Sequence, residues 1–455
     1  MTRRALLERA ALAPTAAGAA GLCSALGFFA ARAQPAPSDY RALVCVFLRG
    51  GVDAFDILIP TEPAAYERYA AGRASLVESY RGARDRSRLL PLGATGHGFP
   101  PQLARLRELY EAGDLAVVAN VGPLIGPVDR DGFESGLARL PPALFSHNDQ
   151  QSAWSALAPE GAPFGWGGLF GDAVVSANTT PSFTAVSVAG NDVFLSGRTT
   201  RPFPVRRGGG ALRIPELRNR GLLGAARNDA EARELIVAHL RAAGFESDNL
   251  FETDLAAASR TAVDNNAAYE AAFDAAPALD GFPSTPLGSQ LRTIARTIAI
   301  RGSLGASRQV FLTSIGGFDT HSGQAAALAG LQIQIADAVN AFRASMTELG
   351  VAREVTLFTA SEFGRTFTPN GDGTDHGWGG HHIVVGGSVR GGRIYGDVPP
   401  PEADHPQAVR GGRLIPTLAV EQYAATLGAW FGLDDAALAA ALPNLARFIG
   451  RPDFA

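Results

Sequence analysis

The sequence contains no lysine. All 40 of its lysine or arginine residues are arginines, and this excludes two kinds of enzyme site. A Schiff-base mechanism needs a lysine nucleophile, and the phosphate-binding loop G-x-x-x-x-G-K-[S/T] needs a lysine near its end. The Gly-x-Gly-x-x-Gly fingerprint is also missing after the first expected strand. Its absence counts against a nucleotide cofactor.

Cysteine and charge are both scarce. The two cysteines are Cys23, in the N-terminal segment, and Cys45, in an apolar run. If the N-terminal segment is removed, one cysteine remains, so we expect no internal disulfide and no zinc site built from thiolates. Only 18% of the residues are charged, and the formal net charge is −4. An acidic chain binds the phosphate backbone poorly, so we expect no nucleic-acid partner.

The N-terminus has the pattern of an export signal. Thr2-Arg3-Arg4-Ala5-Leu6-Leu7 resembles the twin-arginine consensus, residues 10–31 are rich in Ala and Gly, and Ala31-Arg32-Ala33 is a small-x-small cleavage site. The pattern predicts a signal peptide over residues 1–33, transport of the folded chain by the twin-arginine translocase, and a periplasmic or extracellular location. A retained membrane anchor is the alternative. Pro14 and the low leucine content disfavour it, so we expect no stable membrane span after cleavage.

Apolar runs of strand length alternate with segments of helical spacing along the rest of the chain. This alternation predicts an α/β fold with a mostly parallel central sheet and helices on both faces. We expect a single domain over residues 34–455, with an insertion at about 190–285 that includes a Gly-, Arg- and Pro-rich surface excursion at 196–222. Strands are expected at 43–48, 115–121, 183–188, 309–315, 354–360 and 383–387, and helices at 102–111, 226–276, 291–300, 324–349, 420–431 and 435–448.

Acidic and imidazole side chains gather where the expected strands end. In an open α/β sheet, ligands bind beyond the carboxyl ends of the strands. Carboxylate oxygens together with imidazole nitrogens suit a divalent metal, with zinc favoured and manganese, calcium or magnesium as alternatives. Any single loop histidine is more simply explained as a solvated side chain, so the prediction rests on the group. The candidate metal ligands are Asp53, Asp319, His321, Glu362, Asp375, His376 and His382.

Three further residues are candidates for the chemistry itself. Ser146 lies beside His147 and Asp149, and it is either a nucleophile or the N-cap of a helix over the following residues. His147 or Asp149 would assist proton transfer. Arg365 would either clamp an anionic oxygen pair or pair with a surface carboxylate.

Several segments together resemble the protein family of unknown function DUF1501, a secreted, twin-arginine-exported branch of the alkaline phosphatase/sulfatase-like superfamily. They run in order over almost the whole chain. The matching segments are the twin-arginine leader, Leu48-Arg49-Gly50-Gly51-Val52-Asp53, Phe145-Ser146-His147-Asn148, Phe318-Asp319-Thr320-His321, and Ser361-Glu362-Phe363-Gly364-Arg365 through Thr374-Asp375-His376-Gly377.

The resemblance implies roles for residues in these segments. Asp53 would bind a first metal, Ser146 would be the nucleophile, and Asp319 and His321 would bind a second metal with His382 or His381. The chain departs from the superfamily at Glu362-Phe363, where Asp-His is usual after the strand. One imidazole ligand is therefore lost unless Asp375-His376 replaces it from the next loop.

Two functions from different classes fit this pattern. One is a metal-dependent hydrolase of phosphate, sulfate or related esters, acting outside the cytoplasm on an anionic ester or polymer. The alternative is a non-catalytic, metal-containing binding or assembly protein on the same alkaline-phosphatase-like fold with a degenerate site, which Phe363 favours. A third possibility, an accessory of an oxidoreductase, rests on the export signal alone.

Overall fold

The computed structural model describes residues 40–211, 235, 237–239 and 249–455. All of these belong to one compact unit, Pro37–Ala455. The expected export signal at 1–33 lies outside the described residues, as does much of the first half of the helix expected at 226–276. The signal peptide and the domain boundaries therefore stay predictions.

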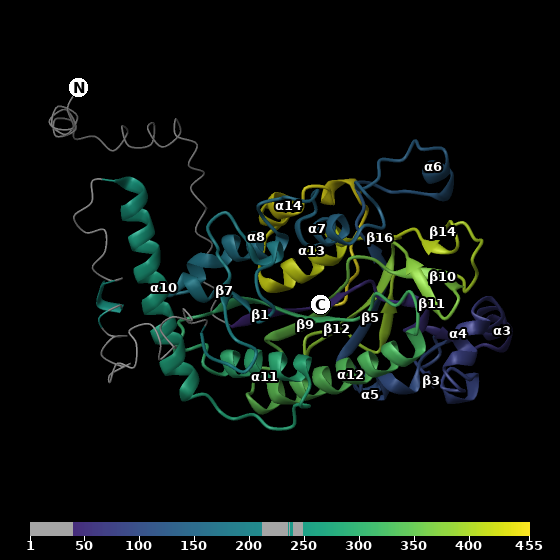
Figure 1. Cartoon of the computed structure of the whole chain (residues 1–455), viewed down its shortest axis with the longest axis horizontal. Coiled ribbons are helices and arrows are strands. Elements are labelled where there is room, and N and C mark those ends of the chain that lie inside the picture. The colour runs from purple at the N-terminus through teal and green to yellow at the C-terminus, as the bar shows by residue number, and fades with distance from the viewer. Residues whose placement is uncertain (1–39, 212–234, 236, 240–248) are drawn as a thin grey trace, which may run out of the picture. The chain divides into compact units, whose positions relative to one another are not determined.

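A nine-stranded sheet forms the centre of this unit (Figure 1). Its strand order is β13-β5-β12-β9-β1-β8-β6-β7, with β16 also paired to β5. All of these strands except β12 run in the same direction, because β12 is antiparallel to both of its neighbours. The strands are β1 Arg41–Arg49, β5 Leu115–Gly122, β6 Ala185–Ser187, β7 Phe203–Pro204, β8 Arg308–Gly316, β9 Val355–Ala360, β12 Gly380–Val385, β13 Arg393–Tyr395 and β16 Leu418–Ala419.

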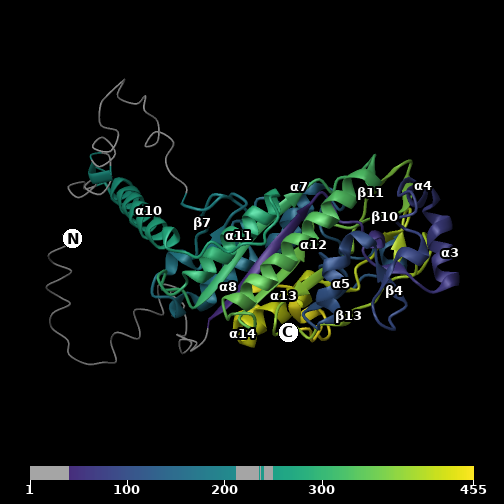
Figure 2. The ribbon, with the colours of Figure 1, turned by 90° about the horizontal axis from the view of Figure 1, so that it is seen from below.

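The central strand β1 is buried on both faces, and its alternating side chains divide between two cores. Val44 and Val46 belong to the core under α5, α11 and α12, whereas Cys45 and Phe47 belong to the core under α7, α8, α13 and α14. The two groups of helices lie on opposite sides of the sheet (Figures 1 and 2). The helices are α5 Ala104–Glu111, α7 His147–Ala156, α8 Trp166–Val174, α11 Pro286–Ala299, α12 Gln324–Glu348, α13 Val420–Phe431 and α14 Asp435–Ala441. The predicted α/β fold, with a mostly parallel sheet and helices on both faces, is confirmed.

Local chemistry explains where the main helices begin and end. Thr285 caps α11 by accepting a hydrogen bond from the backbone N–H of Gly288, and Pro286 takes the first helical position. Gly432 ends α13 with φ +113°, a left-handed conformation that favours glycine. The helix predicted at 420–431 matches α13 residue for residue.

The short elements around the sheet carry little sequence pattern, and most were not predicted. A two-stranded hairpin, β10–β11, follows β9 and carries part of the site. Within the region predicted as a surface excursion, β7 instead joins the edge of the central sheet beside β6. The remaining short strands and α-helices are β2 Ile59–Pro60, β3 Leu90–Pro91, β4 His97–Phe99, β10 Arg365–Asn370, β11 Gly373–His376, β14 Ala408–Val409, β15 Arg413–Leu414, α3 Pro63–Gly72, α4 Ala74–Ser79 and α6 Arg130–Glu134. The long helix α10, Leu250–Asp274, lies within the helix predicted at 226–276.

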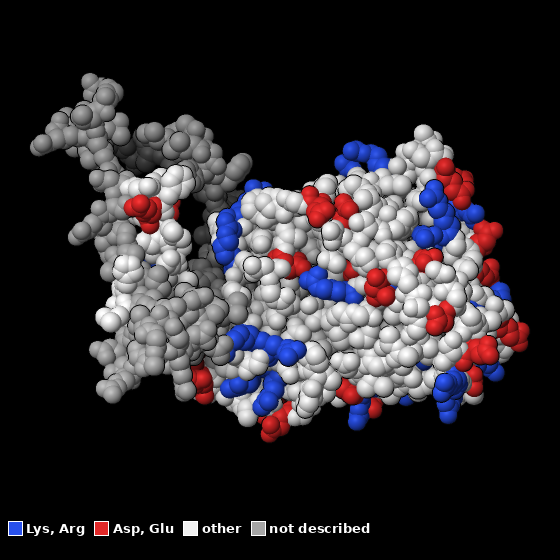
Figure 3. All heavy atoms as spheres, in the orientation of Figure 1, with Lys and Arg blue, Asp and Glu red and all other residues white. Residues whose placement is uncertain are grey.

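Two observations, on helix hydrophobicity and on surface charge, bear on the expected partners. Among the described residues, one helix, α12, is long and apolar enough to cross a membrane by length and composition alone. It packs Leu328, Val339 and Phe342 into the core beneath the sheet, as a core helix of a globular domain does. On the face shown in Figure 3, acidic and basic side chains of the described residues are interspersed.

Candidate metal centre

The predicted site residues leave the sheet at one edge. β1 lies between β8 and β9, and its Phe47 is opposite Ser314 on one side and Ala360 on the other. Because the three strands are parallel and end almost level, the loops that follow them meet beyond the same edge. These loops carry residues 50–53, 317–321 and 361–364.

Gly50 and Gly51 allow these loops to approach one another closely. Both have positive φ, +118° and +91°. A Cβ on Gly50 would lie 2.3 Å from the backbone nitrogen of Asp319, and a Cβ on Gly51 would lie 2.4 Å from the ring of Phe363. Any larger residue would push the loops apart, so the glycine pair fixes the spacing of the site.

Three imidazoles converge on the carboxylate of Asp319. Nε2 of His321 lies 3.0 Å, and Nε2 of His376 lies 3.2 Å, from Oδ1 of Asp319. Nε2 of His147 lies 3.5 Å from Oδ2. His321 follows β8, His376 ends β11, and His147 is the first residue of α7. We call these four residues, a candidate site for a metal ion, the metal centre.

The opposite nitrogen of each imidazole faces an acceptor. Nδ1 of His147 lies 2.9 Å from Oε1 of Glu362, and Nδ1 of His321 lies 3.4 Å from Oδ1 of Asp375. Nδ1 of His376 donates to the carbonyl oxygen of Phe145 at 2.7 Å. A proton on Nδ1 of His147 and of His376 would be held by these oxygens and would leave Nε2 of each ring free to bind a metal. Acceptors behind Nδ1 orient metal-binding histidines in this way.

Two nitrogen atoms of the centre lie close together. Nε2 of His321 and Nε2 of His376 are only 3.0 Å apart. Burial lowers the pKa of His376, which favours its neutral form. Without a proton or a cation between them, two Nε2 atoms at this distance would repel each other. The residues present thus fit a divalent metal held by three nitrogens and a carboxylate.

Two predicted ligands, Glu362 and Asp375, lie behind the imidazoles. Glu362 is fully buried, and its Oε1 accepts hydrogen bonds from the backbone N–H of Gly50 at 2.7 Å and from Gln151 at 3.3 Å, besides facing His147. Asp375 also accepts a hydrogen bond from Asn370. In these positions both carboxylates orient a histidine.

Arg365 sits beneath Asp319. Its guanidinium is fully buried and donates to Oδ1 of Asp319 at 2.7 Å and to the carbonyl oxygen of Phe318 at 2.9 Å. Burial raises the pKa of Asp319, but the hydrogen bond and charge of Arg365 outweigh it and lower the pKa below its usual value. Arg365 therefore keeps Asp319 ionised and adds positive charge to the floor of the site.

Phe363 occupies the position where the resemblance leads us to expect a ligand histidine. Its ring stacks on His376 with centroids 4.6 Å apart and packs against His147 at 4.9 Å. It therefore packs against two imidazoles of the centre and restricts their rotation.

Asp53 is engaged in a different interaction. Its Oδ2 pairs with the buried guanidinium of Arg73 and accepts a hydrogen bond from Gln324 at 2.6 Å, while Oδ1 caps the backbone N–H of Phe55. A guanidinium built into the chain thus neutralises the acid that the resemblance assigns to a first metal. This pairing could not be predicted from the sequence, because Arg73 lies in a helical region with no motif around it.

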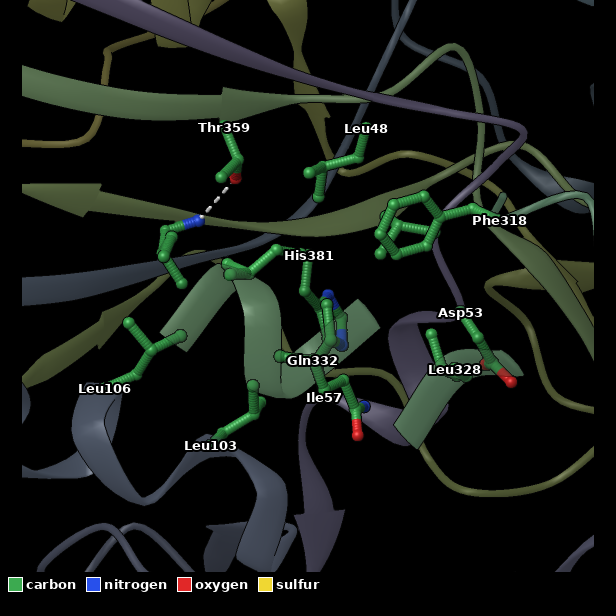
Figure 4. Close-up of a pocket in the computed structure, with 13 residues that line it drawn as sticks. Leu48, Asp53, Ile57, Leu103, Leu106, Phe318, Leu328, Gln332, Thr359 and His381 are labelled. Atoms are coloured by element: carbon green, nitrogen blue, oxygen red, sulfur yellow. Dashed lines mark hydrogen bonds between the residues drawn. The ribbon is translucent and has the colours of Figure 1, made fainter. Parts of the chain in front are cut away.

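His381 and His382 belong to the interior. His381 accepts a hydrogen bond at Nδ1 from the backbone N–H of Asn120 and lines a cavity between the sheet and helices α5 and α12. Figure 4 shows this cavity walled mainly by apolar side chains such as Leu106 and Phe318, with the carboxylate of Asp53 pointing away from its middle. An apolar cavity of this kind is a poor site for a charged ester.

His382 packs in the opposite core, with its ring 5.2 Å from that of Trp154 and 6.0 Å from that of Tyr423. Burial lowers the pKa values of His381 and His382 to about 3. Both rings are therefore neutral at physiological pH. Neither is among the imidazoles that surround Asp319.

Ser146 immediately precedes α7 and so lies next to His147. Its Oγ donates to Oδ2 of Asp149 at 2.8 Å, and its side chain makes no capping hydrogen bond to the helix backbone. The serine therefore occupies the N-cap position, yet its hydroxyl is directed to a carboxylate. Phe145, one residue earlier, has φ +75°, a strained value for a phenylalanine. Its carbonyl is the one that holds His376.

Two arginines beside the centre were not predicted as site residues. Arg49, at the end of β1, donates to Gln151 at 3.0 Å and pairs with Asp192 at 2.7 Å. Arg413, in β15, donates to the carbonyl oxygen of His376 at 2.7 Å. Arg49 could have been predicted as a site residue, because it lies in the Leu48-Arg49-Gly50-Gly51 segment that carries the family resemblance. Arg413 could not, because no motif surrounds its two-residue strand.

The model of the DUF1501 family, described as a protein of unknown function, matches residues 40–442. The chain belongs to this family. The match spans all the segments of the metal centre. Among curated proteins, no relative matches the chain.

Solved structures to which this DUF1501 protein is similar include the crystal structure of Ps i-CgsB in complex with k-i-k-neocarrahexaose. The identity is 9% and the TM-score 0.35, over 88% of this chain and 74% of that one. The PsFucS1 sulfatase from Pseudoalteromonas sp. is similar with 11% identity and a TM-score of 0.32, over 88% of this chain and 68% of that one. Similarities this distant carry no argument about the activity, which therefore depends on the site itself.

Proposed function

We propose that this protein is an exported, metal-dependent hydrolase of phosphate, sulfate or related anionic esters. The convergence of three Nε2 atoms on the Asp319 carboxylate, with an acceptor behind each Nδ1, carries the proposal. His147, His321, His376 and Asp319 would hold one divalent metal. Three imidazoles and one carboxylate favour zinc, with manganese, calcium or magnesium as alternatives.

The charges around the centre support an anionic substrate. When bound, the metal would polarise an ester oxygen and lower the barrier to attack. Arg413 lies beside the centre and donates there only to a backbone carbonyl, while Arg365 and Arg49 are each paired with an aspartate. Guanidinium groups suit the paired oxygens of phosphate and sulfate, and an anionic polymer fits the same chemistry.

Ser146 is the proposed nucleophile. Its Oγ already donates its proton to Asp149 at 2.8 Å, so the carboxylate is in place to accept that proton as Oγ bonds to phosphorus or sulfur. The leaving alkoxide would depart with the electrons of the broken ester bond. His147, also a candidate for proton transfer, is better placed as a metal ligand because its Nε2 faces Asp319.

A non-catalytic binding or assembly protein is the second candidate. It is favoured by Phe363, which stands where an imidazole ligand would be, and by Arg73, which neutralises Asp53. Both observations point to one metal where the superfamily resemblance implies two. Under this alternative the metal would stabilise the loops without turnover.

Export by the twin-arginine translocase to the periplasm or beyond is part of the proposal. It is supported by Arg3-Arg4 and by the cleavage pattern ending at Ala33. Since this route carries folded proteins, the metal would be loaded before export.

Elemental analysis and ester turnover test the proposal together. Protein purified from the periplasm is expected to contain one divalent metal per chain and to hydrolyse an aryl phosphate or aryl sulfate. Ser146→Ala should abolish turnover and retain the metal. Ser135→Ala, which removes an exposed hydroxyl from the end of α6, is the matched control. Metal with no turnover of either ester would establish the binding alternative, and protein without metal would refute both.

A further inference from the structure

A second cavity lies at the carboxyl end of α7, away from the histidines at its amino end. It has a volume of about 190 Å³, which exceeds the roughly 150 Å³ of an apolar cavity known to hold a benzene-sized ring. Its walls are mainly apolar: four prolines, Leu124, Ile125 and Leu157 contribute to them. Glu421, from the first turn of α13, also lines it.

Glu421 is the unusual feature of this cavity. Its side chain is 1% exposed. Oε1 accepts a hydrogen bond from Asn444 at 3.0 Å, but Oε2 is buried without any hydrogen-bond partner among the described residues. A buried carboxylate oxygen with no donor is costly, so such an atom in a residue that lines a cavity indicates a missing partner.

The nearby charges indicate what kind of partner is missing. Arg447 also lines the cavity, but its guanidinium donates to the carbonyl oxygen of Ile125 at 2.9 Å. Arg139, also on the cavity wall, is exposed. Among the described residues, the buried acid therefore has hydrogen bonds from the Asn444 amide and from its own backbone N–H, and no directly bonded cation. An ammonium group would supply both the hydrogen-bond donor and the charge.

We propose that this cavity binds a small molecule with an apolar body and a primary amine, the nitrogen donating to Oε2 of Glu421. The apolar walls take the body of the ligand, and the amine is the group that orients it. The site uses none of the residues of the metal centre, so it is independent of the proposed hydrolase activity.

The ionisation of Glu421 gives this binding a pH dependence. Burial raises the pKa of Glu421 to about 7, against the smaller opposing effects of the Asn444 hydrogen bond, its own backbone N–H and the charge of Arg447. Below that pH the carboxyl becomes protonated and loses the charge that attracts an ammonium. Binding of an amine is therefore expected to weaken by about tenfold or more as the pH falls from 8 to 5.5.

Cyclohexylamine is a suitable probe because its ring matches the cavity and it carries one primary amine. Titration calorimetry with the full chain at pH 8 is expected to give a Kd of about 1 mM or tighter. Glu421→Gln should weaken binding by about tenfold or more. Glu348→Gln, an exposed acid on α12, is the matched control and should bind as the wild type does.

Two further measurements keep the proposal testable if Glu421→Gln fails to fold. Ala158→Trp fills the cavity from another side without altering Glu421, and it should also abolish binding. Cyclohexanol, with the same ring and a neutral hydroxyl, should bind about tenfold more weakly than the amine at pH 8. Equal binding of the two probes, or no binding of cyclohexylamine, would overturn the assignment.

Discussion

Two groups of acidic side chains lie near the carboxyl end of β1, and they satisfy their charge in opposite ways. In one, which we call the ion-pair cluster, Asp53 pairs with Arg73 and Asp56 pairs with Arg84. All four side chains are buried to 1% exposure or less. In the metal centre, Asp319 pairs with Arg365 but has 46% of its side chain exposed, and Nε2 atoms of three imidazoles face it.

The difference lies in where the cation comes from. In the ion-pair cluster the cations are guanidinium groups of the chain itself, and Arg84 donates hydrogen bonds to both carboxylate oxygens of Asp56, at 2.5 and 2.7 Å. Each of these carboxylates therefore has its counter-ion within the folded chain. In the metal centre Arg365 pairs with Oδ1 of Asp319, but the side that carries the three imidazoles is open to solvent. An accessible group of nitrogen and oxygen ligands can take a further cation from solution, and we propose that the two regions differ in role for this reason.

Removing a guanidinium from the ion-pair cluster should have the largest effect, a loss of folding stability. Arg73→Met leaves the carboxylate of Asp53 buried without its cation, so the free energy of unfolding should fall by about 3–5 kcal/mol. Denaturant unfolding of the metal-free protein measures this. Arg68→Met, in which the lost partner Glu402 is exposed, is the matched control and should cost about 1 kcal/mol or less. An effect of similar size in both variants would contradict the comparison.

Removing an imidazole from the metal centre should weaken metal binding and leave the stability of the metal-free protein almost unchanged. His321→Ala is expected to weaken zinc binding by more than about 100-fold, since it removes a nitrogen that faces the metal. Stability without metal should change little, because the His321 side chain is 45% exposed. Competition with a zinc-sensitive dye reports the affinity. His97→Ala, in the small sheet formed by β2, β3 and β4, should bind zinc like the wild type.

The same division explains how much could be predicted from the sequence. The continuous apolar run of β1 and the helical spacing of α13 predicted the sheet and its covering helices, because burial periodicity is local. The grouping of Asp319, His321 and His376 followed from placing acids and histidines at strand ends. Pairing between distant side chains has no such local pattern. Nothing in the sequence around Arg73 indicates that it reaches Asp53.

A carboxylate behind the metal centre should have an intermediate effect. Glu362→Gln keeps the size of the side chain but removes the charge that faces Nδ1 of His147. Zinc affinity is expected to fall by about 10–100-fold, less than for His321→Ala. The same dye competition measures it, with Glu348→Gln as the exposed control. A loss as large as that of His321→Ala would indicate that Glu362 binds the metal directly.

Introducing an imidazole at Phe363, where the superfamily resemblance would place a ligand histidine, should have the smallest effect on metal content. Phe363→His places a nitrogen ligand beside Gly51, but Asp53 remains paired with Arg73, so a second metal would lack its carboxylate. We expect elemental analysis to give one metal per chain, as in the wild type. Two metals per chain would show that a metal ion can displace the guanidinium. The ion-pair cluster would then be a second cation site, which the guanidinium of Arg73 occupies in the wild type. The two regions would differ only in which cation occupies them.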